Sequence, residues 1–480
     1  MAESIRKDSI NSVKWASIEK FSLQGIQFVI GIVLARLLTP EDYGTIGMLT
    51  IFIAISQTFV DSGFTSALIR KIDRTEEDLS TAFIINLLIS AVAVIILCVT
   101  APYIASFYNM PILCPIIRVQ SATLVVYALM AVQVTKLTTE LNFKAIAKCS
   151  VISSLSSGLV GIGLAYMGFG VWSLVFQNLL SVIINMCCVV WCCRWYPKTG
   201  FSKASFNDLF SFGKNILGAS LLTSVYDNIT SLVIGKCFSS ESLGIYSRGT
   251  SLAALPVTNI NGILGKVTYP IFSKLQNDTD RLVSSYRKYI QITSMIIFFG
   301  CCLVAALGTP LVLFLLTDKW SEAIIYLQIY SFAIIVDHLN AINLNLIKVK
   351  GRSDLILRLE IIKRMISFAI LFSAIPFGVI GICVSKIFYG YIAVIINSYY
   401  NGKLFNLGIS VQFKDFIKYF IVSVISVIPA FSITLTDLPN IVQLCSGVVI
   451  SCCIYCYILK SDSNYVEIKQ MILSTIHRKL

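Results

Sequence analysis

Long apolar stretches follow one another along the whole chain and are separated by short polar segments. Many of them reach the roughly 20 residues that a helix needs to cross a bilayer. They lack the residue-by-residue alternation of a barrel strand. The pattern therefore predicts an all-α polytopic membrane protein with about fourteen transmembrane helices. The predicted spans are 16–38, 43–62, 80–105, 113–134, 147–167, 170–193, 212–238, 244–270, 288–316, 321–345, 357–376, 379–400, 414–435 and 440–459.

The composition agrees with this reading. The 480 residues are 56% hydrophobic and only 13% charged, about half the charged fraction of a soluble protein. The net charge of +13 comes from basic residues that cluster in the short loops of one side. This asymmetry indicates membrane topology rather than nucleic-acid binding, and it predicts that both termini face the cytoplasm. Residues 1–17 have no short apolar core before a small-residue cleavage site, so no cleaved signal peptide is predicted.

The chain repeats itself at a spacing of about 200 residues. Each copy has an apolar helix, a basic residue at its exit, a Ser/Thr-Glu turn and a glycine that opens the next helix. The matched residues are Arg36 and Lys236, Thr39 and Ser239, Glu41 and Glu241, and Gly44 and Gly244. We therefore predict two tandem six-helix lobes, 1–200 and 201–405, followed by two extra helices and a tail in 406–480. Repeated membrane bundles are typical of transporters.

Several short motifs occur in a specific order. They are LARLLTPEDYG at 34–44, LNFK at 141–144, GFGVWSLV at 168–175, LGIYSR at 243–248 and the stretch 255–276. In these motifs the chain resembles the Wzx-type polysaccharide and oligosaccharide flippases of the MATE/flippase (MOP) superfamily. The subgroup that it most resembles exports lipopolysaccharide, colanic acid and teichuronic acid. The resemblance covers residues 10–400, and no motif is matched beyond about residue 410.

The resemblance implies a monomeric, fourteen-helix transporter of the bacterial cytoplasmic membrane. Its cargo would be an oligosaccharide on undecaprenyl pyrophosphate, moved from the cytoplasmic to the outer leaflet by alternating access for O-antigen, capsule or exopolysaccharide export. No cofactor is implied, although H⁺ or Na⁺ would be the candidate coupling ion. A polysaccharide polymerase or export machinery is a further candidate partner. The alternative function is a MATE-like ion-coupled efflux antiporter.

Basic residues at membrane depth are the first candidates for contacts with an anionic pyrophosphate. Arg364 lies roughly 18 Å before the outer boundary at Pro376, and Lys386 lies roughly 12 Å into its span, both by helix rise. Arg364 would act as a bidentate clamp, whereas Lys363 and Lys386 would act as point charges. The alternative is neutralisation along the helix, because Glu360 precedes Lys363 and Arg364 at helical spacing.

Lys20, Arg36 and Lys236 are further cavity candidates at the ends of their spans. For Lys20 the alternative is snorkelling to the interface. For Arg36 and Lys236 it is anchoring of the helix end, where a cation also favours the helix dipole.

Three residues are candidates for ion coupling. Asp227 is placed near the midplane, and Asp337 and His338 form an acid–histidine pair. A buried carboxylate can bind a cation or a proton, and histidine titrates near neutrality. Each can equally be the partner of a polar group on another helix. No phosphate-binding loop, nucleophile elbow or metal motif occurs, so no catalytic residue, metal site or enzyme activity is predicted.

Overall fold

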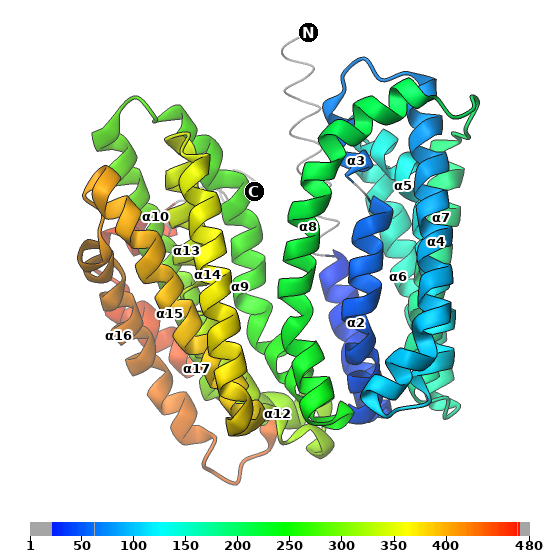
Figure 1. Ribbon diagram of the computed structural model, residues 1–480. Helices are drawn as coiled ribbons and strands as arrows, with labels where there is room; N and C mark the ends of the chain where they lie inside the picture. Colours follow the sequence, from blue (N-terminus) through cyan, green and yellow to red (C-terminus); the bar gives the residue numbers. More distant parts are fainter. Residues whose placement is uncertain (1–21, 62, 468, 471–480) are drawn as a thin grey trace, which may run out of the picture. The chain divides into compact units, whose positions relative to one another are not determined.

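The computed structural model describes residues 22–61, 63–467 and 469–470, and within these ranges all regular secondary structure is helical (Figure 1). After a first helix over 22–37, the helices are α2 Pro40–Asp61, α3 Phe64–Arg70, α4 Glu76–Tyr108, α5 Leu113–Thr139, α6 Phe143–Tyr166, α7 Val171–Cys193, α8 Lys203–Cys237, α9 Ser240–Lys274, α10 Thr279–Ala306, α11 Gly308–Leu316, α12 Ala323–Ile334, α13 Asp337–Val349, α14 Ser353–Ala374, α15 Gly378–Phe405, α16 Ile409–Ile433 and α17 Asn440–Leu459.

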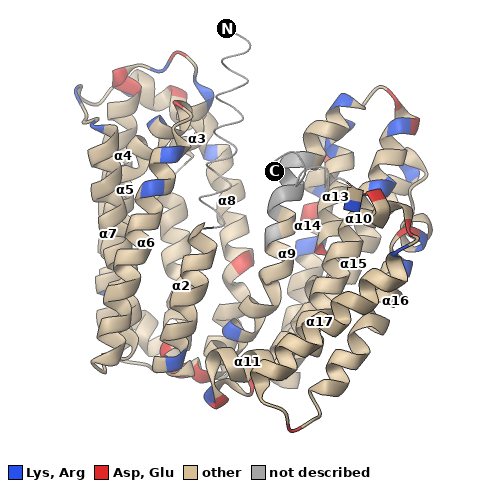
Figure 2. Ribbon diagram, turned by 180° about the vertical axis from the view of Figure 1, so that it is seen from behind, with Lys and Arg blue, Asp and Glu red and all other residues tan. Residues whose placement is uncertain are grey.

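Eleven of the described helical segments are long and apolar enough to cross a membrane. One of them, Asp354–Phe405, joins two of the predicted spans. The chain is thus a multi-pass membrane protein, while the count of fourteen spans stays a prediction. In each half of the molecule the acidic and basic residues gather mainly towards the helix ends (Figure 2). Such a distribution is expected, because a charge in the hydrocarbon region is costly.

Two predicted spans are interrupted in the structure. The span 288–316 is broken at Leu307, between α10 and α11, and the span 321–345 is broken at Ile335 and Val336, between α12 and α13. Pro310 follows the first break, and its missing N–H and fixed φ suit the first turn of a new helix. At the second break Asp337 begins α13, where a carboxylate favours the helix dipole.

The two Ser/Thr-Glu turns of the repeat are helix caps. The backbone N–H of Asp42 donates to Thr39 Oγ1 at 3.3 Å, and that of Ser242 donates to Ser239 Oγ at 3.0 Å. Asp42 also accepts from the Thr39 backbone N–H at 2.9 Å, which completes a reciprocal cap of the capping-box type. α2 and α9 therefore begin at residues 40 and 240, one turn before the glycines that the sequence placed at the helix start.

The glycines Gly44 and Gly244 instead mark a backbone-to-backbone crossing. A Cβ on Gly44 would overlap the carbonyl oxygen of Ser240, and a Cβ on Gly244 would overlap that of Pro40. Each added Cβ would also lie 3.0 Å from the backbone nitrogen of the other glycine. The contact is reciprocal, and it joins the two glycines that the repeat of about 200 residues matches with each other. Only glycine allows two helices to approach this closely.

The chain divides into two compact units at Gly244 and Ile245. In the first unit α4 packs against α5, α6 against α7, and α8 against α2 and α4. α8, which the sequence assigns to the second lobe, thus packs in the first unit, and the predicted lobe boundaries stay a prediction. Lys71, in the loop before α4, contacts Asp78 at 2.9 Å and Asp208 of α8 at 3.0 Å. Hydrogen bonds to these two carboxylates raise the pKa of Lys71 above its ordinary value.

The core of the second unit contains a buried amide network. Asn343 Oδ1 accepts hydrogen bonds from Tyr286 at 2.5 Å, Asn401 at 2.6 Å and Gln412 at 3.1 Å. Asn343 Nδ2 donates in turn to Gln412 Oε1 at 3.0 Å. Asn343, Asn401 and Gln412 are fully buried, so these bonds replace the water that their polar groups have lost. The network joins α10, α13, α15 and α16.

Gly44→Ala should lower the free energy of unfolding by about 1–3 kcal/mol, because the added methyl meets backbone that cannot rotate away. The thermal unfolding midpoint in detergent measures the loss. Gly244→Ala should cost a similar amount. The double variant should cost less than the sum, because the first methyl already separates the helices.

The control for this experiment is Gly163→Ala in α6, where an added Cβ meets nothing within 4 Å. It should leave the protein unchanged or stabilise it by up to about 1 kcal/mol through helix propensity. Equal midpoints for Gly44→Ala and Gly163→Ala would contradict the close crossing.

Candidate functional site

The candidate cations of α14 share one carboxylate. Lys363 Nζ lies 2.5 Å from Glu360 Oε1, and Arg364 Nε lies 3.9 Å from Glu360 Oε2. The Lys363 side chain is only 6% exposed, so without Glu360 it would be a buried and uncompensated charge. The neutralisation that the sequence left open as an alternative is therefore present for Lys363. Arg364 is half-buried and farther from the shared carboxylate, so its charge is less fully matched by Glu360.

Lys386 lies on α15, which packs against α14. Its side chain is half-buried within the protein, and its depth in the bilayer stays a prediction. Arg364 and Lys386 thus occupy adjacent helices of the second unit. Their contact with a cargo stays a prediction.

The repeat-related cations Arg36 and Lys236 are both exposed at the ends of their helices. Lys236 Nζ donates a hydrogen bond to the backbone carbonyl of Phe107 and lies 4.4 Å from the centroid of the Phe107 ring. These contacts tie the end of α8 to the last turn of α4, as an anchoring role requires. Lys20 lies outside the described residues.

The coupling candidates occupy different surroundings. Asp227 is exposed on α8. His338 is fully buried, and its Nε2 lies 2.8 Å from Ser294 Oγ of α10, with the Phe298 ring edge-on beside the imidazole. Asp337 is the first residue of α13 and is half-buried. Neighbouring helix residues point about 100° apart, so His338 pairs with Ser294 of another helix rather than with its sequence neighbour.

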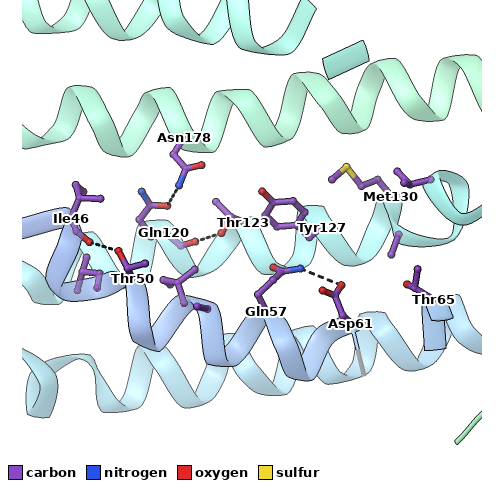
Figure 3. A pocket seen from close by; sticks show the side chains of 15 residues that line it. Ile46, Thr50, Gln57, Asp61, Thr65, Gln120, Thr123, Tyr127, Met130 and Asn178 are labelled. Atoms are coloured by element: carbon purple, nitrogen blue, oxygen red, sulfur yellow. Dashed lines mark hydrogen bonds between the residues drawn. The ribbon is translucent and has the colours of Figure 1, made fainter. Parts of the chain in front are cut away.

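The structure reveals a cavity that the sequence analysis did not find (Figure 3). It has a volume of about 550 Å³ and lies within the first unit, between α2 and α5, with contributions from α3 and α7. Its polar lining residues are Thr50, Gln57, Asp61, Thr65, Gln120, Thr123, Tyr127 and Asn178. Its apolar lining residues are Ile46, Leu49, Ile53, Ala54, Met130, Ala131 and Val134.

Hydrogen bonds organise the polar side of this cavity. Gln57 Nε2 donates to Asp61 Oδ1 at 3.4 Å along α2, and Asn178 Nδ2 of α7 donates to Gln120 Oε1 of α5 at 3.3 Å. The Thr123 hydroxyl donates to the Gln120 carbonyl at 2.6 Å. Gln57 Oε1 is buried, and no partner for it exists within the described part of the chain. Eleven buried side-chain N or O atoms lack a hydrogen-bond partner among the described residues, and Gln57 Oε1 is the one of them that belongs to a residue lining this cavity.

The sequence contained a signal for this site. Thr50, Gln57 and Asp61 recur at one helix face of the second predicted span, and Gln120, Thr123 and Tyr127 recur at one face of the fourth. In an apolar segment, uncharged amides and hydroxyls are a weaker sequence signal of a functional site than Lys or Arg. Among the described residues, no group of three or more His, Cys, Asp or Glu could hold a metal ion.

Comparisons with known proteins converge on one class. The model of a family described as polysaccharide biosynthesis protein matches residues 33–325. The teichuronic acid biosynthesis protein TuaB of Bacillus subtilis is 25% identical over 440 residues, which cover 90% of each chain. The lipopolysaccharide biosynthesis protein WzxC of Escherichia coli is 24% identical over 389 residues, which cover 79% of this chain and 78% of WzxC.

Solved structures share the fold. The lipid II flippase MurJ, in an inward closed conformation, matches with a TM-score of 0.75 at 15% identity, over 93% of this chain and 98% of MurJ. An inward-facing multidrug resistance MATE family transporter of the MOP superfamily matches with a TM-score of 0.63 at 16% identity, over 82% and 98% of the two chains. The fold is therefore that of the MurJ and MATE transporters, and the chain is a multi-pass protein of the bacterial inner membrane.

Variants of Glu360 and Lys363 test whether this ion pair stabilises the folded protein. Glu360→Gln should lower the free energy of unfolding by about 1–3 kcal/mol, less than for a fully buried pair because Glu360 is 34% exposed. Glu360→Gln combined with Lys363→Met should recover most of that loss, since no charge then stays buried. Thermal unfolding midpoints of the three variants measure this. A double variant with the same unfolding midpoint as Glu360→Gln would contradict the claim that Glu360 stabilises the fold by neutralising Lys363.

Proposed function

Because the chain belongs to the family of polysaccharide biosynthesis proteins, we propose that it is a lipid-linked oligosaccharide flippase. In this proposal it carries oligosaccharide units on undecaprenyl pyrophosphate from the cytoplasmic to the outer leaflet by alternating access, for surface polysaccharide export. The family match is the observation that carries the proposal. The roles of its relatives TuaB and WzxC in teichuronic acid and lipopolysaccharide biosynthesis support it.

The cargo defines what the side chains must do. A sugar head and a pyrophosphate cannot cross hydrocarbon unaided, so the protein replaces their hydration with hydrogen bonds and charge. Arg364 and Lys386, on adjacent helices, are the proposed pyrophosphate contacts, because guanidinium and ammonium groups bind phosphate oxygens strongly. Lys363 is already held by Glu360 and contributes to packing in this proposal. Movement of a lipid between leaflets breaks no covalent bond, so the protein is proposed to act as a transporter and not as an enzyme.

A MATE-like ion-coupled efflux antiporter is the alternative, since MATE transporters share the fold. The fold does not separate the two functions, whereas the family match favours the flippase. In either function, H⁺ or Na⁺ is the proposed coupling ion, and Asp227 is a proposed site for it. The protein is proposed to work as a monomer that hands its product to a polysaccharide polymerase or to export machinery.

Purified protein in proteoliposomes should move the native undecaprenyl-pyrophosphate oligosaccharide to the opposite leaflet. The sidedness of the sugar, read by an impermeant sugar-oxidising reagent, measures this. Arg364→Ala and Lys386→Ala should each slow the transfer by about tenfold to a hundredfold, the value of a charged hydrogen bond.

The matched control is Arg281→Ala, because the Arg281 side chain is 79% exposed and pairs only locally with Asp278. It should leave the rate unchanged. Absence of any protein-dependent transfer, with the native glycolipid present and an ion gradient imposed, would refute the flippase. Unchanged rates in both Ala variants would instead remove Arg364 and Lys386 as cargo contacts.

Asp227→Asn should abolish the dependence of transfer on a sodium or pH gradient if Asp227 binds the coupling ion. The substitution keeps the shape of the side chain and removes its charge. Transfer rates with and without each gradient, at matched protein levels, give the readout. A gradient dependence equal to that of the wild type would discard this role.

A further inference from the structure

The cavity of the first unit is elongated. Along α2 its lining runs from Ile46 to Asp61, about 22 Å of helix, and along α5 it runs from Gln120 to Val134, about 21 Å. This length is about two thirds of a hydrocarbon core of roughly 30 Å. Polar groups line it from end to end in Figure 3, with Gln120 and Asn178 near one end and Asp61 near the other.

Eight of the fifteen lining residues are polar, and all of these except Asp61 are uncharged hydrogen-bonding residues. Three carboxamides offer both donors and acceptors, and threonine and tyrosine hydroxyls can do both as well. Asp61 is the single ionisable carboxylate among the lining residues, and none of those described is Lys, Arg or His. Polar side chains at membrane depth are costly unless they have a function or a partner.

This lining excludes several ligands. A pyrophosphate would meet a carboxylate and no cation, which is the reverse of what phosphate oxygens require. A bare cation needs about six oxygens around one point, whereas these groups are spread over about 20 Å. A lipid tail would leave the amides without partners. A chain of hydroxyl groups matches both the length and the chemistry.

We propose that this cavity binds the saccharide portion of the cargo, with Gln57, Asp61 and the Gln120–Asn178 pair hydrogen-bonding sugar hydroxyls. The unpaired Gln57 Oε1 is the acceptor that a sugar hydroxyl satisfies. Its Nε2 is already turned towards Asp61, so the amide orientation is fixed before the ligand arrives. The cavity thereby selects cargo by its sugar, separately from the pyrophosphate. This proposal rests on the proposed function.

The test compares two lipids that differ only in the sugar. Labelled native glycolipid is bound to the purified full-length protein in nanodiscs and displaced by unlabelled glycolipid or by sugar-free undecaprenyl pyrophosphate. In Gln57→Leu and Asn178→Leu the affinity for the glycolipid should fall about tenfold each, the value of one hydrogen bond to a buried partner. The affinity for the sugar-free lipid should change less than about twofold.

The matched control is Thr58→Val, next to Gln57 on α2, because the Thr58 hydroxyl donates to the Ala54 carbonyl of its own helix and does not line the cavity. It should bind both lipids as the wild type does. All variants are compared only at equal thermal midpoints. A parallel loss for both lipids, or no loss for either, would overturn the sugar site.

Two further outcomes separate this proposal from others. Asp61→Asn keeps a hydrogen-bonding side chain and should weaken glycolipid binding only a few-fold. If it instead removes a sodium or proton dependence and weakens both lipids equally, the cavity is an ion site and the sugar proposal fails. A wild-type protein that binds neither lipid would refute the proposed flippase function. This result differs from equal changes in the affinities for both lipids, which would refute only the sugar site.

Discussion

Every polar group that enters the hydrocarbon must find its partner inside the protein, and this constraint explains most of the structure. It makes the described chain helical, because a helix satisfies its own backbone. It also explains why side-chain amides occur in groups. Asn343 accepts three hydrogen bonds at one oxygen, His338 pairs with Ser294, and Lys363 pairs with Glu360. Gln57 Oε1 differs from the other buried oxygens that lack a partner among the described residues in that its residue lines the cavity of the first unit.

The two units differ in how their buried polar side chains are hydrogen-bonded. In the second unit a hydrogen-bond network around Asn343 joins four helices, although Asn401 Oδ1 in this network has no partner among the described residues. The first unit leaves an open row of amides and hydroxyls along α2 and α5. A closed network stabilises a packed core, whereas an open row keeps hydrogen-bonding capacity for a ligand. The distinction separates residues that hold the fold from residues available for cargo.

The all-helical, multi-pass fold was accessible from the sequence, because the length of an apolar stretch is a strong signal. Each predicted span coincides with helix in the described residues, and the family resemblance is confirmed. The breaks at Leu307 and at Ile335–Val336 were missed, since hydropathy does not register an interruption of the helix within an apolar stretch. The role of Lys363 stayed ambiguous because helical spacing permits a pair with Glu360 without requiring it. The cavity was missed because its residues come from four helices, and their convergence depends on tertiary packing.

The crossing of α2 and α9 has a mechanical consequence. Where side chains interdigitate, ridges and grooves set the angle between two helices. At Gly44 and Gly244 the backbones touch directly, so the contact fixes how closely the first turns of the two helices approach each other. Such a contact leaves no room for a side chain at either position, so the spacing of the two helix starts depends on both residues being glycine. The caps at Thr39 and Ser239 lie about one turn before these glycines, so each helix is already regular where the two backbones meet.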